Sequence, residues 1–282
     1  MTPNEHLQAA EDLLGAEASG EQIGLLTKRH PEMEMEDAYA VQNAVYRTKL
    51  ERGRSVVGWK IGLTSKAMQY ALNIEIPDSG ILFDDMLFDH GATVPNGRFI
   101  QPRIEAEIAF VMKSPIGGSG VTRDDVLKAT DYVAPSIEIL DTRIVRLDSE
   151  TGRTRTVFDT ISDNAANAGV VIGPARHAVD AFDLRWVGAI TLRNTEVEET
   201  GLGAGVLNDP VESVVWLARR MAQYGQSIEP GQIILSGSFI RPVECPAGAQ
   251  IVADFGAFGY VDINFDEGKI HASTAAKDIV VG

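Results

Sequence analysis

From residue 103 onward the chain consists mainly of short apolar runs of strand length, and this pattern limits the folds that it can adopt. The runs are rich in β-branched residues and are separated by turn residues. They do not alternate regularly with helical segments, which predicts an α+β fold with a mixed or antiparallel sheet and not a doubly wound one. The expected strands cover residues 103–112, 134–140, 168–172, 187–193, 232–235, 250–255 and 260–265.

The N-terminal part of the chain has the opposite pattern and predicts helices. Asn4 can cap a first helix, with Gly15 as its stop. Apolar residues at helical spacing predict a second helix that ends near Gly53. The regions expected from this change of pattern are an α-rich N-terminal region at 1–55, a catalytic β domain at 56–266 and a C-terminal tail at 267–282.

Two helices interrupt the later strands, and both have clear start signals. Thr122, with Asp125 three residues later, predicts a capping box. Asp209 is the expected cap of the second helix, with Pro210 in its first turn. Residues 77–80, Pro-Asp-Ser-Gly, predict a turn between strands.

The charge balance limits the partners that the chain can have. Its 282 residues carry 40 acidic and 25 basic side chains, a formal net charge of −15. Nucleic acids and anionic membrane surfaces bind basic faces, so both are disfavoured as partners. An anionic small-molecule substrate needs local positive charge, from a metal ion or from a few placed Lys and Arg residues.

Cysteine use and hydropathy indicate the compartment. Cys245 is the only cysteine, so no internal disulfide can form, and we interpret it as a structural thiol. No apolar run reaches the roughly 18 residues that a membrane-spanning helix needs. The N-terminus has no secretory signal pattern. These features predict a cytoplasmic protein.

Three glutamates in strand-like segments are the most informative chemical feature. Glu105 and Glu107 share one face of the expected strand, because strand side chains alternate between faces. Glu138 lies between two isoleucines in another apolar segment. Buried carboxylates need a counter-charge, and oxygen donors without a nearby Cys or His suit Mg²⁺ or Mn²⁺. A solvated strand face is the alternative for Glu105 and Glu107.

Lys60 lies in an apolar strand segment between Trp59 and Ile61, with glycines at 58 and 62. Glycine within a strand permits close approach of backbone or ligand. Lys60 could therefore bind a substrate carboxylate or transfer a proton. The alternative is a lysine whose charged end reaches solvent from a half-buried strand.

Two further segments have the composition of a site. Residues 158–169 are dense in Asp, Asn, Ser and Thr yet lead into an apolar strand, and such segments often line sites, although an ordinary turn is the alternative. Residues 231–238 end a strand in small hydroxyl residues, which is typical of the edge of a site. The five histidines are scattered, and the Gly-x-Ser-x-Gly motif of serine hydrolases is absent.

Taken together, these segments resemble the fumarylacetoacetate hydrolase superfamily, and most closely its hydratase and decarboxylase branch. The resemblance extends over roughly residues 25–265, with the motifs in the same order. The segments that carry it are GWKIGLTSKAMQ at 58–69, DDMLF at 84–88, PRIEAEIAF at 102–110, and the runs at 157–172, 198–201 and 231–238.

The resemblance implies a mixed β-roll preceded by a small α-rich N-terminal region. It implies that Glu105, Glu107 and Glu138 bind Mg²⁺ or Mn²⁺ and that Lys60 lies beside a small 2-oxo acid substrate. It also implies a homo-oligomer, either a dimer or a ring of dimers.

The reaction expected from the resemblance is the addition of water to 2-oxohept-4-ene-1,7-dioate, giving 4-hydroxy-2-oxoheptanedioate, in the breakdown of aromatic compounds. Lys60 is the expected proton-transfer group, and Asp78, Asp163 or a metal-bound water is its partner. Arginine pairs with carboxylates through two parallel hydrogen bonds, so Arg155 is expected to bind the distal carboxylate of a dioate, although it could simply lie in a solvated hairpin. The expected substrate contacts are Arg155, Phe158, Gln232 and Ser238.

Four other functions remain open at this point. A 2-oxopent-4-enoate hydratase and a 4-oxalocrotonate decarboxylase share the expected fold and metal. A carbon–carbon hydrolase of the same superfamily would need a His–Glu pair, and only His90 lies between Lys60 and Glu105. A non-catalytic subunit is disfavoured because the expected metal ligands and Lys60 are all present.

Overall fold

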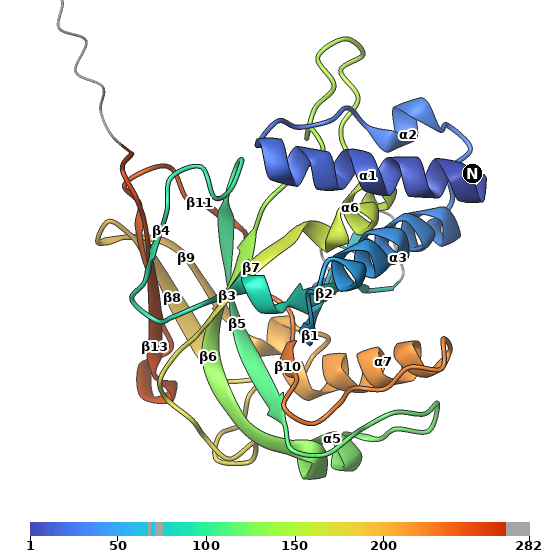
Figure 1. Cartoon of the computed structure of the whole chain (residues 1–282). Helices are drawn as coiled ribbons and strands as arrows, with labels where there is room; N and C mark the ends of the chain where they lie inside the picture. The colour runs from blue at the N-terminus through green and yellow to red at the C-terminus, as the bar shows by residue number, and fades with distance from the viewer. Residues whose placement is uncertain (67–68, 71–75, 269–282) are drawn as a thin grey trace, which may run out of the picture.

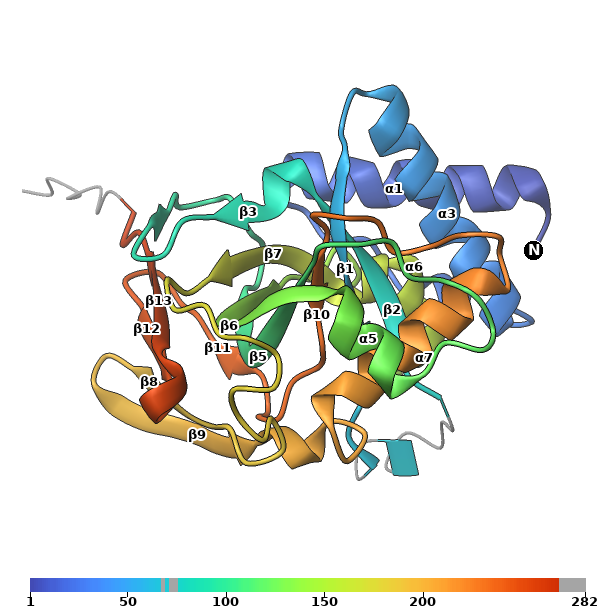
Figure 2. The same ribbon diagram turned by 90° about the horizontal axis from the view of Figure 1, so that it is seen from below.

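The computed structural model describes residues 1–66, 69–70 and 76–268, and its N-terminal helices lie apart from the smaller of its two sheets (Figures 1 and 2). Helices α1 (Pro3–Ser19) and α3 (Met35–Glu51) lie on one side, and a five-stranded sheet lies on the other. An eight-stranded sheet curls between them. The remaining helices of the described residues are α2 (Leu26–Arg29), α5 (Arg123–Ala129), α6 (Val157–Ser162) and α7 (Pro210–Ala222).

The larger sheet has the order β2-β1-β10-β5-β6-β7-β3, with β11 also paired to β5. The pairs β1–β10 and β3–β7 are parallel and the others are antiparallel, so the sheet is mixed and the α+β prediction is confirmed. Its strands are β1 (Val56–Gly62), β2 (Asp78–Phe83), β3 (Leu87–Phe88), β5 (Arg103–Met112), β6 (Thr130–Leu140), β7 (Asn167–Ile172), β10 (Ile233–Leu235) and β11 (Val243–Glu244).

The smaller sheet has the order β4-β13-β12-β8-β9. Strand β9 was not expected from the sequence, because most of its side chains are polar and exposed and give no apolar alternation. The strands of this sheet are β4 (Thr93–Val94), β8 (Gly188–Arg193), β9 (Glu196–Leu202), β12 (Gln250–Asp254) and β13 (Tyr260–Phe265).

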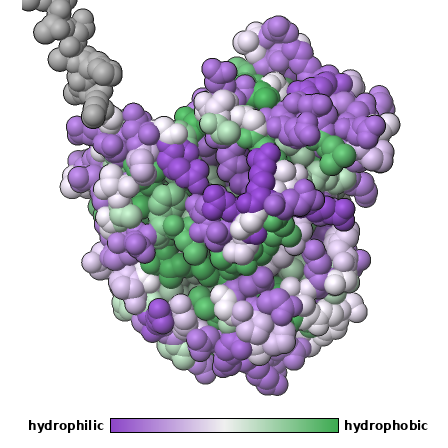
Figure 3. Space-filling view, viewed as in Figure 1, coloured by the Kyte–Doolittle hydropathy of each residue, from purple (hydrophilic) through white to green (hydrophobic). Residues whose placement is uncertain are grey.

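Each face of β5 has a separate function in packing. Ile104, Ile108 and Phe110 are fully buried in the main core, together with apolar residues of α7, β12 and β13. The opposite face points to the inside of the curled sheet, where Ala109 belongs to a small apolar cluster with Leu82, Val170 and Leu235. Figure 3 shows the face of the molecule that is seen in Figure 1. Hydrophobic residues gather in the middle of this face and are bordered by hydrophilic residues.

The four predicted helices are present, but both predicted ends of the first helix are wrong. The first helix begins after Thr2, whose hydroxyl accepts from the Glu5 N–H while the Glu5 carboxylate accepts from the Thr2 N–H at 2.6 Å. This capping box explains why Thr2 and not Asn4 is the cap. The helix passes through Gly15 and ends at Gly20, whose φ of 75° is left-handed. The predicted caps Thr122 and Asp209 are confirmed.

The turn predicted at 77–80 is wrong, because residues 78–80 begin β2 and pair with β1. Pairing with a neighbouring strand outweighs the local turn preference of these residues. The tail predicted at 267–282 lies outside the described residues from position 269 on. None of the described helices is long and apolar enough to cross a membrane.

Candidate metal centre and active site

The pairing of β5 with β6 brings three carboxylates together. Glu105 lies directly opposite Glu138, and Glu107 lies two residues further along the same face of β5. One carboxylate oxygen from each of the three side chains lies within 4.8 Å of the other two. The period-two alternation of β5 therefore places both of its glutamates inside the curled sheet, while the residues between them enter the core.

The three carboxylates form a buried cluster whose chemistry suits a cation. Glu107 and Glu138 are fully buried, and Glu105 is half-buried. Burial and the neighbouring Glu138 raise the pKa of Glu105 to about 8, and the same causes raise the pKa of Glu107 well above its ordinary value. Glu107 Oε1 and both Glu138 oxygens have no hydrogen-bond partner among the described residues. Buried carboxylate oxygens that accept no hydrogen bond fit a hard divalent ion such as Mg²⁺.

Glu107 is oriented by the segment that follows β10. Its Oε2 accepts a hydrogen bond of 2.7 Å from the Gly237 N–H. A Cβ at position 237 would lie 2.4 Å from the Thr64 hydroxyl oxygen, and the φ of 117° also favours glycine. Gly237 therefore allows its N–H to reach the carboxylate. Sequence reasoning missed this residue, although it had identified the segment 231–238 as a site edge.

Lys60 and Asp78 lie together beside the carboxylates. The Lys60 ammonium is buried, 3.4 Å from Glu138 Oε1. A Cβ at Gly62 would lie 2.2 Å from Asp78 Oδ1 and 3.0 Å from Lys60 Nζ, so both groups converge on the space that this glycine leaves open. Burial opposes the charge on Lys60, but Glu138 and Asp78 outweigh it and raise the Lys60 pKa. Burial raises the pKa of Asp78, against the charges of Lys60 and Arg155.

A left-handed turn contacts Lys60 from the other side. Asn164, Ala165 and Ala166 have φ values of 53°, 52° and 61°. Such conformations cost roughly 1–2 kcal/mol per residue for L-amino acids. The turn places the Ala165 carbonyl 3.1 Å from Lys60 Nζ. Strain of this kind collects at functional sites, where the surrounding structure maintains it.

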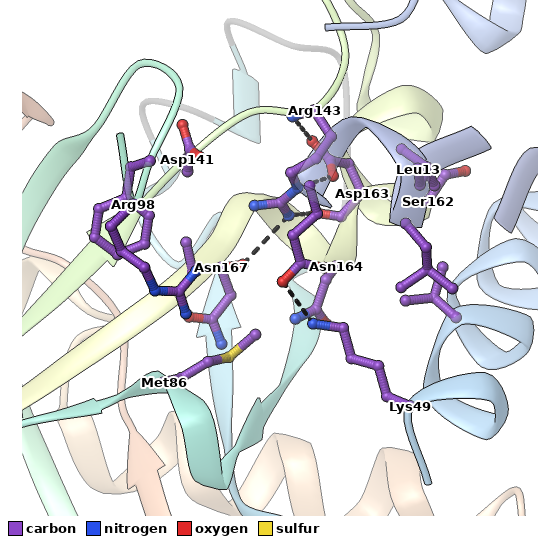
Figure 4. Close-up of a pocket in the computed structure, with 15 residues that line it drawn as sticks. Leu13, Lys49, Met86, Arg98, Asp141, Arg143, Ser162, Asp163, Asn164 and Asn167 are labelled. Atoms are coloured by element: carbon purple, nitrogen blue, oxygen red, sulfur yellow. Dashed lines mark hydrogen bonds and ion pairs between the residues drawn. The ribbon is translucent and has the colours of Figure 1, made fainter. Parts of the chain in front are cut away.

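Asp163 does not contact Lys60 or the carboxylate cluster. Its carboxylate accepts from the backbone N–H of Arg143 at 2.9 Å and from the Arg143 side chain, and both residues are buried. The pair lines a cavity of about 30 Å³ between the N-terminal helices and the sheet (Figure 4). Burial raises the pKa of Asp163, and Arg143 opposes this rise.

The predicted substrate contacts fall into two groups. Arg155 is half-buried and donates to the Thr142 hydroxyl at 2.6 Å. Its positive charge acts to lower the pKa of Asp78. Ser238 directly follows Gly237, although its hydroxyl donates to the Ile240 carbonyl at 2.9 Å. Ser238 therefore lies next to the residue that orients Glu107, and Arg155 is linked to the site through the effect of its charge on Asp78.

Phe158 and Gln232 lie elsewhere. Phe158 packs against the core of the N-terminal helices. Gln232 precedes β10, at the end of the strand away from Gly237, and its Oε1 accepts from Trp59 Nε1 at 3.1 Å. The structure does not bring either side chain to the carboxylates.

Two residues considered for other chemistries are engaged elsewhere. His90 pairs with Asp262 at 2.8 Å on the smaller sheet, so it forms no His–Glu pair at the metal centre. Cys245 is buried, and burial raises the pKa of its thiol, as expected for a structural cysteine.

Comparison with known proteins shows the family to which the chain belongs. The chain is 50% identical over 260 residues to 2-oxo-hept-4-ene-1,7-dioate hydratase of Escherichia coli, an overlap of 92% of this chain and 97% of the relative. It is 36% identical over 275 residues to 2-keto-4-pentenoate hydratase of Paraburkholderia xenovorans, which covers 98% of this chain and 100% of the relative.

Solved structures extend the comparison to the fold. The 4-oxalocrotonate decarboxylase from Pseudomonas putida G7, complexed with magnesium and adipate, matches with a TM-score of 0.88 and 35% identity, over 94% of this chain and 98% of that chain. Fumarylpyruvate hydrolase from Pseudomonas aeruginosa shares the fold at a TM-score of 0.57 and 12% identity, over 74% of this chain and 88% of that chain. No family model matches the chain.

The curled mixed sheet and the relatives together define an enzyme with a fumarylacetoacetate hydrolase-like fold. Within that class, the chain belongs to the fumarylacetoacetate hydrolase superfamily, in the branch of 2-oxo acid hydratases and decarboxylases.

Proposed function

We propose that this chain is a divalent-metal-dependent hydratase that converts 2-oxohept-4-ene-1,7-dioate into 4-hydroxy-2-oxoheptanedioate. The observation that carries the proposal is the placement of Lys60 and Asp78 beside three carboxylates suited to a cation. The choice of substrate is supported by the 50% identity to a hydratase named for this compound.

The cation would be held by Glu105, Glu107 and Glu138. A bound Mg²⁺ would supply Lewis-acid polarisation of the 2-oxo acid. Magnesium is the favoured ion because the donors are all carboxylate oxygens and because a structural relative was solved with it. Gly237 orients Glu107, and the register of β5 with β6 places Glu105 opposite Glu138.

The proton transfers would fall to Lys60 and Asp78. Hydration of the 4-ene requires a proton to move from C3 to C5, after which hydroxide adds at C4 and a proton returns to C3. Burial raises the pKa of Asp78, and the neighbouring carboxylates raise the pKa of Lys60, so Lys60 would act as the proton donor and Asp78 as its partner in proton transfer. The ammonium of Lys60 also offsets negative charge that builds up on the substrate.

The distal carboxylate of the substrate would bind Arg155. The overall charge of −15 repels a dianion, so the site needs a local cation. Arg155 is half-buried, and the described residues include no carboxylate within salt-bridge distance of its guanidinium. We also propose that the enzyme works in the cytoplasm, which is supported by the single buried cysteine.

Product analysis tests the proposal. Purified protein with Mg²⁺ is incubated with 2-oxohept-4-ene-1,7-dioate, and the products are followed by NMR spectroscopy and mass spectrometry. We expect a product heavier than the substrate by one water, with no release of CO₂. Decarboxylation is the second candidate, favoured by the 35% identity to 4-oxalocrotonate decarboxylase. Release of CO₂ from 4-oxalocrotonate, without hydration of the heptenedioate, would select it.

A further inference from the structure

One guanidinium holds both ends of the left-handed turn that contacts Lys60. Arg143 Nη2 donates to the Asp163 carbonyl at 2.7 Å and to the Asn167 carbonyl at 3.3 Å, and these two residues flank the turn. The Asp163 carboxylate also accepts a hydrogen bond of 2.9 Å from the backbone N–H of Arg143. Figure 4 shows Arg143 and Asp163 facing each other beside Asn164 and Asn167.

We call the contacts of Arg143 with Asp163 and Asn167 the clamp. The middle of the turn packs between this clamp and strand β2. The side-chain amide of Asn164 pairs with both backbone groups of Ile81 on β2, at 2.8 Å and 2.9 Å. A Cβ at Gly80 would lie 2.5 Å from the Asn164 carbonyl oxygen, so the turn rests directly on the strand. The Ala165 carbonyl is thereby held 3.1 Å from Lys60 Nζ.

This geometry depends on its anchors because the backbone does not favour it. Three successive non-glycine residues are left-handed, and two of them are alanines, whose side chains make no hydrogen bond to compensate. Without the clamp, the segment would relax toward an ordinary turn and its carbonyl would leave Lys60. An arginine suits the task because it donates to the Asp163 carboxylate from Nε and to the two carbonyls from Nη2, whereas an ammonium donates from a single nitrogen.

We propose that Arg143 is a positioning residue that acts through this turn to hold the Lys60 ammonium in place between Glu138 and Asp78. The proposal rests on the proposed function, since it requires that Lys60 takes part in the reaction. A simple contribution to stability is the competing explanation, because buried ion pairs often act only on folding.

A double-mutant cycle separates the two explanations. Arg143→Lys keeps the charge but loses the fork, and we expect kcat to fall by about 10- to 100-fold, as a displaced catalytic group would produce. KM and Mg²⁺ affinity, measured by titration calorimetry, should change by less than about 2-fold, since the carboxylate cluster is untouched. In a Lys60→Met background, adding Arg143→Lys should cause no further loss.

Controls keep the result interpretable. Arg98→Lys is the matched variant, because Arg98 lines the same cavity but donates to the Asp85 carbonyl and does not touch the turn, so its kcat should stay near wild type. If Arg143→Lys does not fold, Asp163→Asn replaces it in the cycle, because it removes the carboxylate charge that pairs with Arg143.

Equal losses of kcat in the wild-type and Lys60→Met backgrounds would overturn the proposal, as would unchanged kcat in both clamp variants. Wild-type activity in Lys60→Met alone would instead refute the function proposed for Lys60.

Discussion

At the residue scale, the site contains more negative charge than the protein alone can balance. Glu105, Glu107, Glu138 and Asp78 surround Lys60 inside the curled sheet. One ammonium cannot neutralise four ionised carboxylates, so either some of them hold protons or a cation is bound. This imbalance explains why burial and mutual repulsion raise the pKa values of the glutamates, and why Lys60 keeps its proton.

Lys60→Met removes that ammonium while keeping the length of the side chain. We expect kcat/KM to fall by at least about 100-fold, the lower range for loss of a proton-transfer group. Mg²⁺ affinity should stay the same or increase, because a positive charge 3.4 Å from Glu138 is removed. Steady-state kinetics and titration calorimetry measure the two effects. A parallel loss of metal binding would show that Lys60 holds the cluster together and is not a proton carrier.

Arg155 and Arg153 form a matched pair for testing recognition of the distal carboxylate. Arg155 is half-buried near the site, whereas Arg153 is exposed on the same hairpin. Arg155→Ala should raise KM for the heptenedioate and leave 2-oxopent-4-enoate, which lacks the second carboxylate, nearly unaffected. A lost charge-assisted hydrogen bond is worth roughly 1.5–3 kcal/mol, or about 10- to 150-fold in the ratio of the two specificities.

The control for this comparison is Arg153→Ala, which should leave both substrates unchanged because its side chain is exposed to solvent. If Arg155→Ala affected both substrates equally, Arg155 would not recognise the distal carboxylate.

At the element scale, strand β1 shows how two glycines of one strand differ in role. A Cβ at Gly58 would lie 1.9 Å from the Ile233 carbonyl oxygen, so this glycine permits the parallel pairing of β1 with β10. The three heavy atoms nearest to a Cβ at Gly62 would all belong to the side chains of Asp78 and Lys60. Gly58 is therefore needed for the strand pairing of the sheet, and Gly62 leaves space for the side chains of the site.

The variants Gly58→Ala and Gly62→Ala should separate these roles. Gly58→Ala should lower the free energy of unfolding by about 1–3 kcal/mol, because backbone must move. Gly62→Ala should cost less stability, because a side chain can turn away, yet lower kcat/KM by about 100-fold through displacement of Asp78. Urea denaturation and kinetics on the folded protein give both quantities. Equal destabilisation with normal turnover in both variants would contradict the assignment.

The elements differ in how far the sequence predicted them. Strand β5 was predicted with its bounds, because an apolar run interrupted by acidic residues at every second position from 105 to 107 is a local signal. Strand β2 was predicted as a turn at residues 77–80, because its first residues are turn formers and only pairing with β1 makes them a strand. The left-handed turn at 164–166 could not be predicted, since its conformation is imposed by Arg143 and by Ile81.

At the scale of the whole molecule, the carboxylate cluster couples stability to pH and to metal. The folded-state pKa of Glu105 is about 8, against an ordinary value of 4.5, and that of Glu107 is also raised. Between these values the folded protein binds more protons than the unfolded chain, so its stability falls as pH rises. A divalent ion that binds only the folded state reverses this loss by mass action.

We therefore expect the metal-free protein to lose thermal stability from pH 5 to pH 8, and Mg²⁺ to restore it most at pH 8. At 100 times its dissociation constant, the ion adds about 2.7 kcal/mol. Calorimetric scans with EDTA or Mg²⁺ measure the effect.

Glu107→Gln should fold, lose the response to Mg²⁺ together with activity, and show a shallower fall of thermal stability with pH. A wild-type protein that keeps full activity after exhaustive chelation would rule out the metal centre.

The sequence by itself determined the α+β class, the strand β5 and the side of it that carries Glu105 and Glu107, because alternation and capping are properties of neighbouring residues. Only the tertiary structure decided that Asp78 lies beside Lys60 while Asp163 is paired with Arg143. Those contacts join segments far apart in the chain, and they depend on strand register and on a turn that is held in place from outside. Their physical cause is long-range packing, which no local pattern of residues encodes.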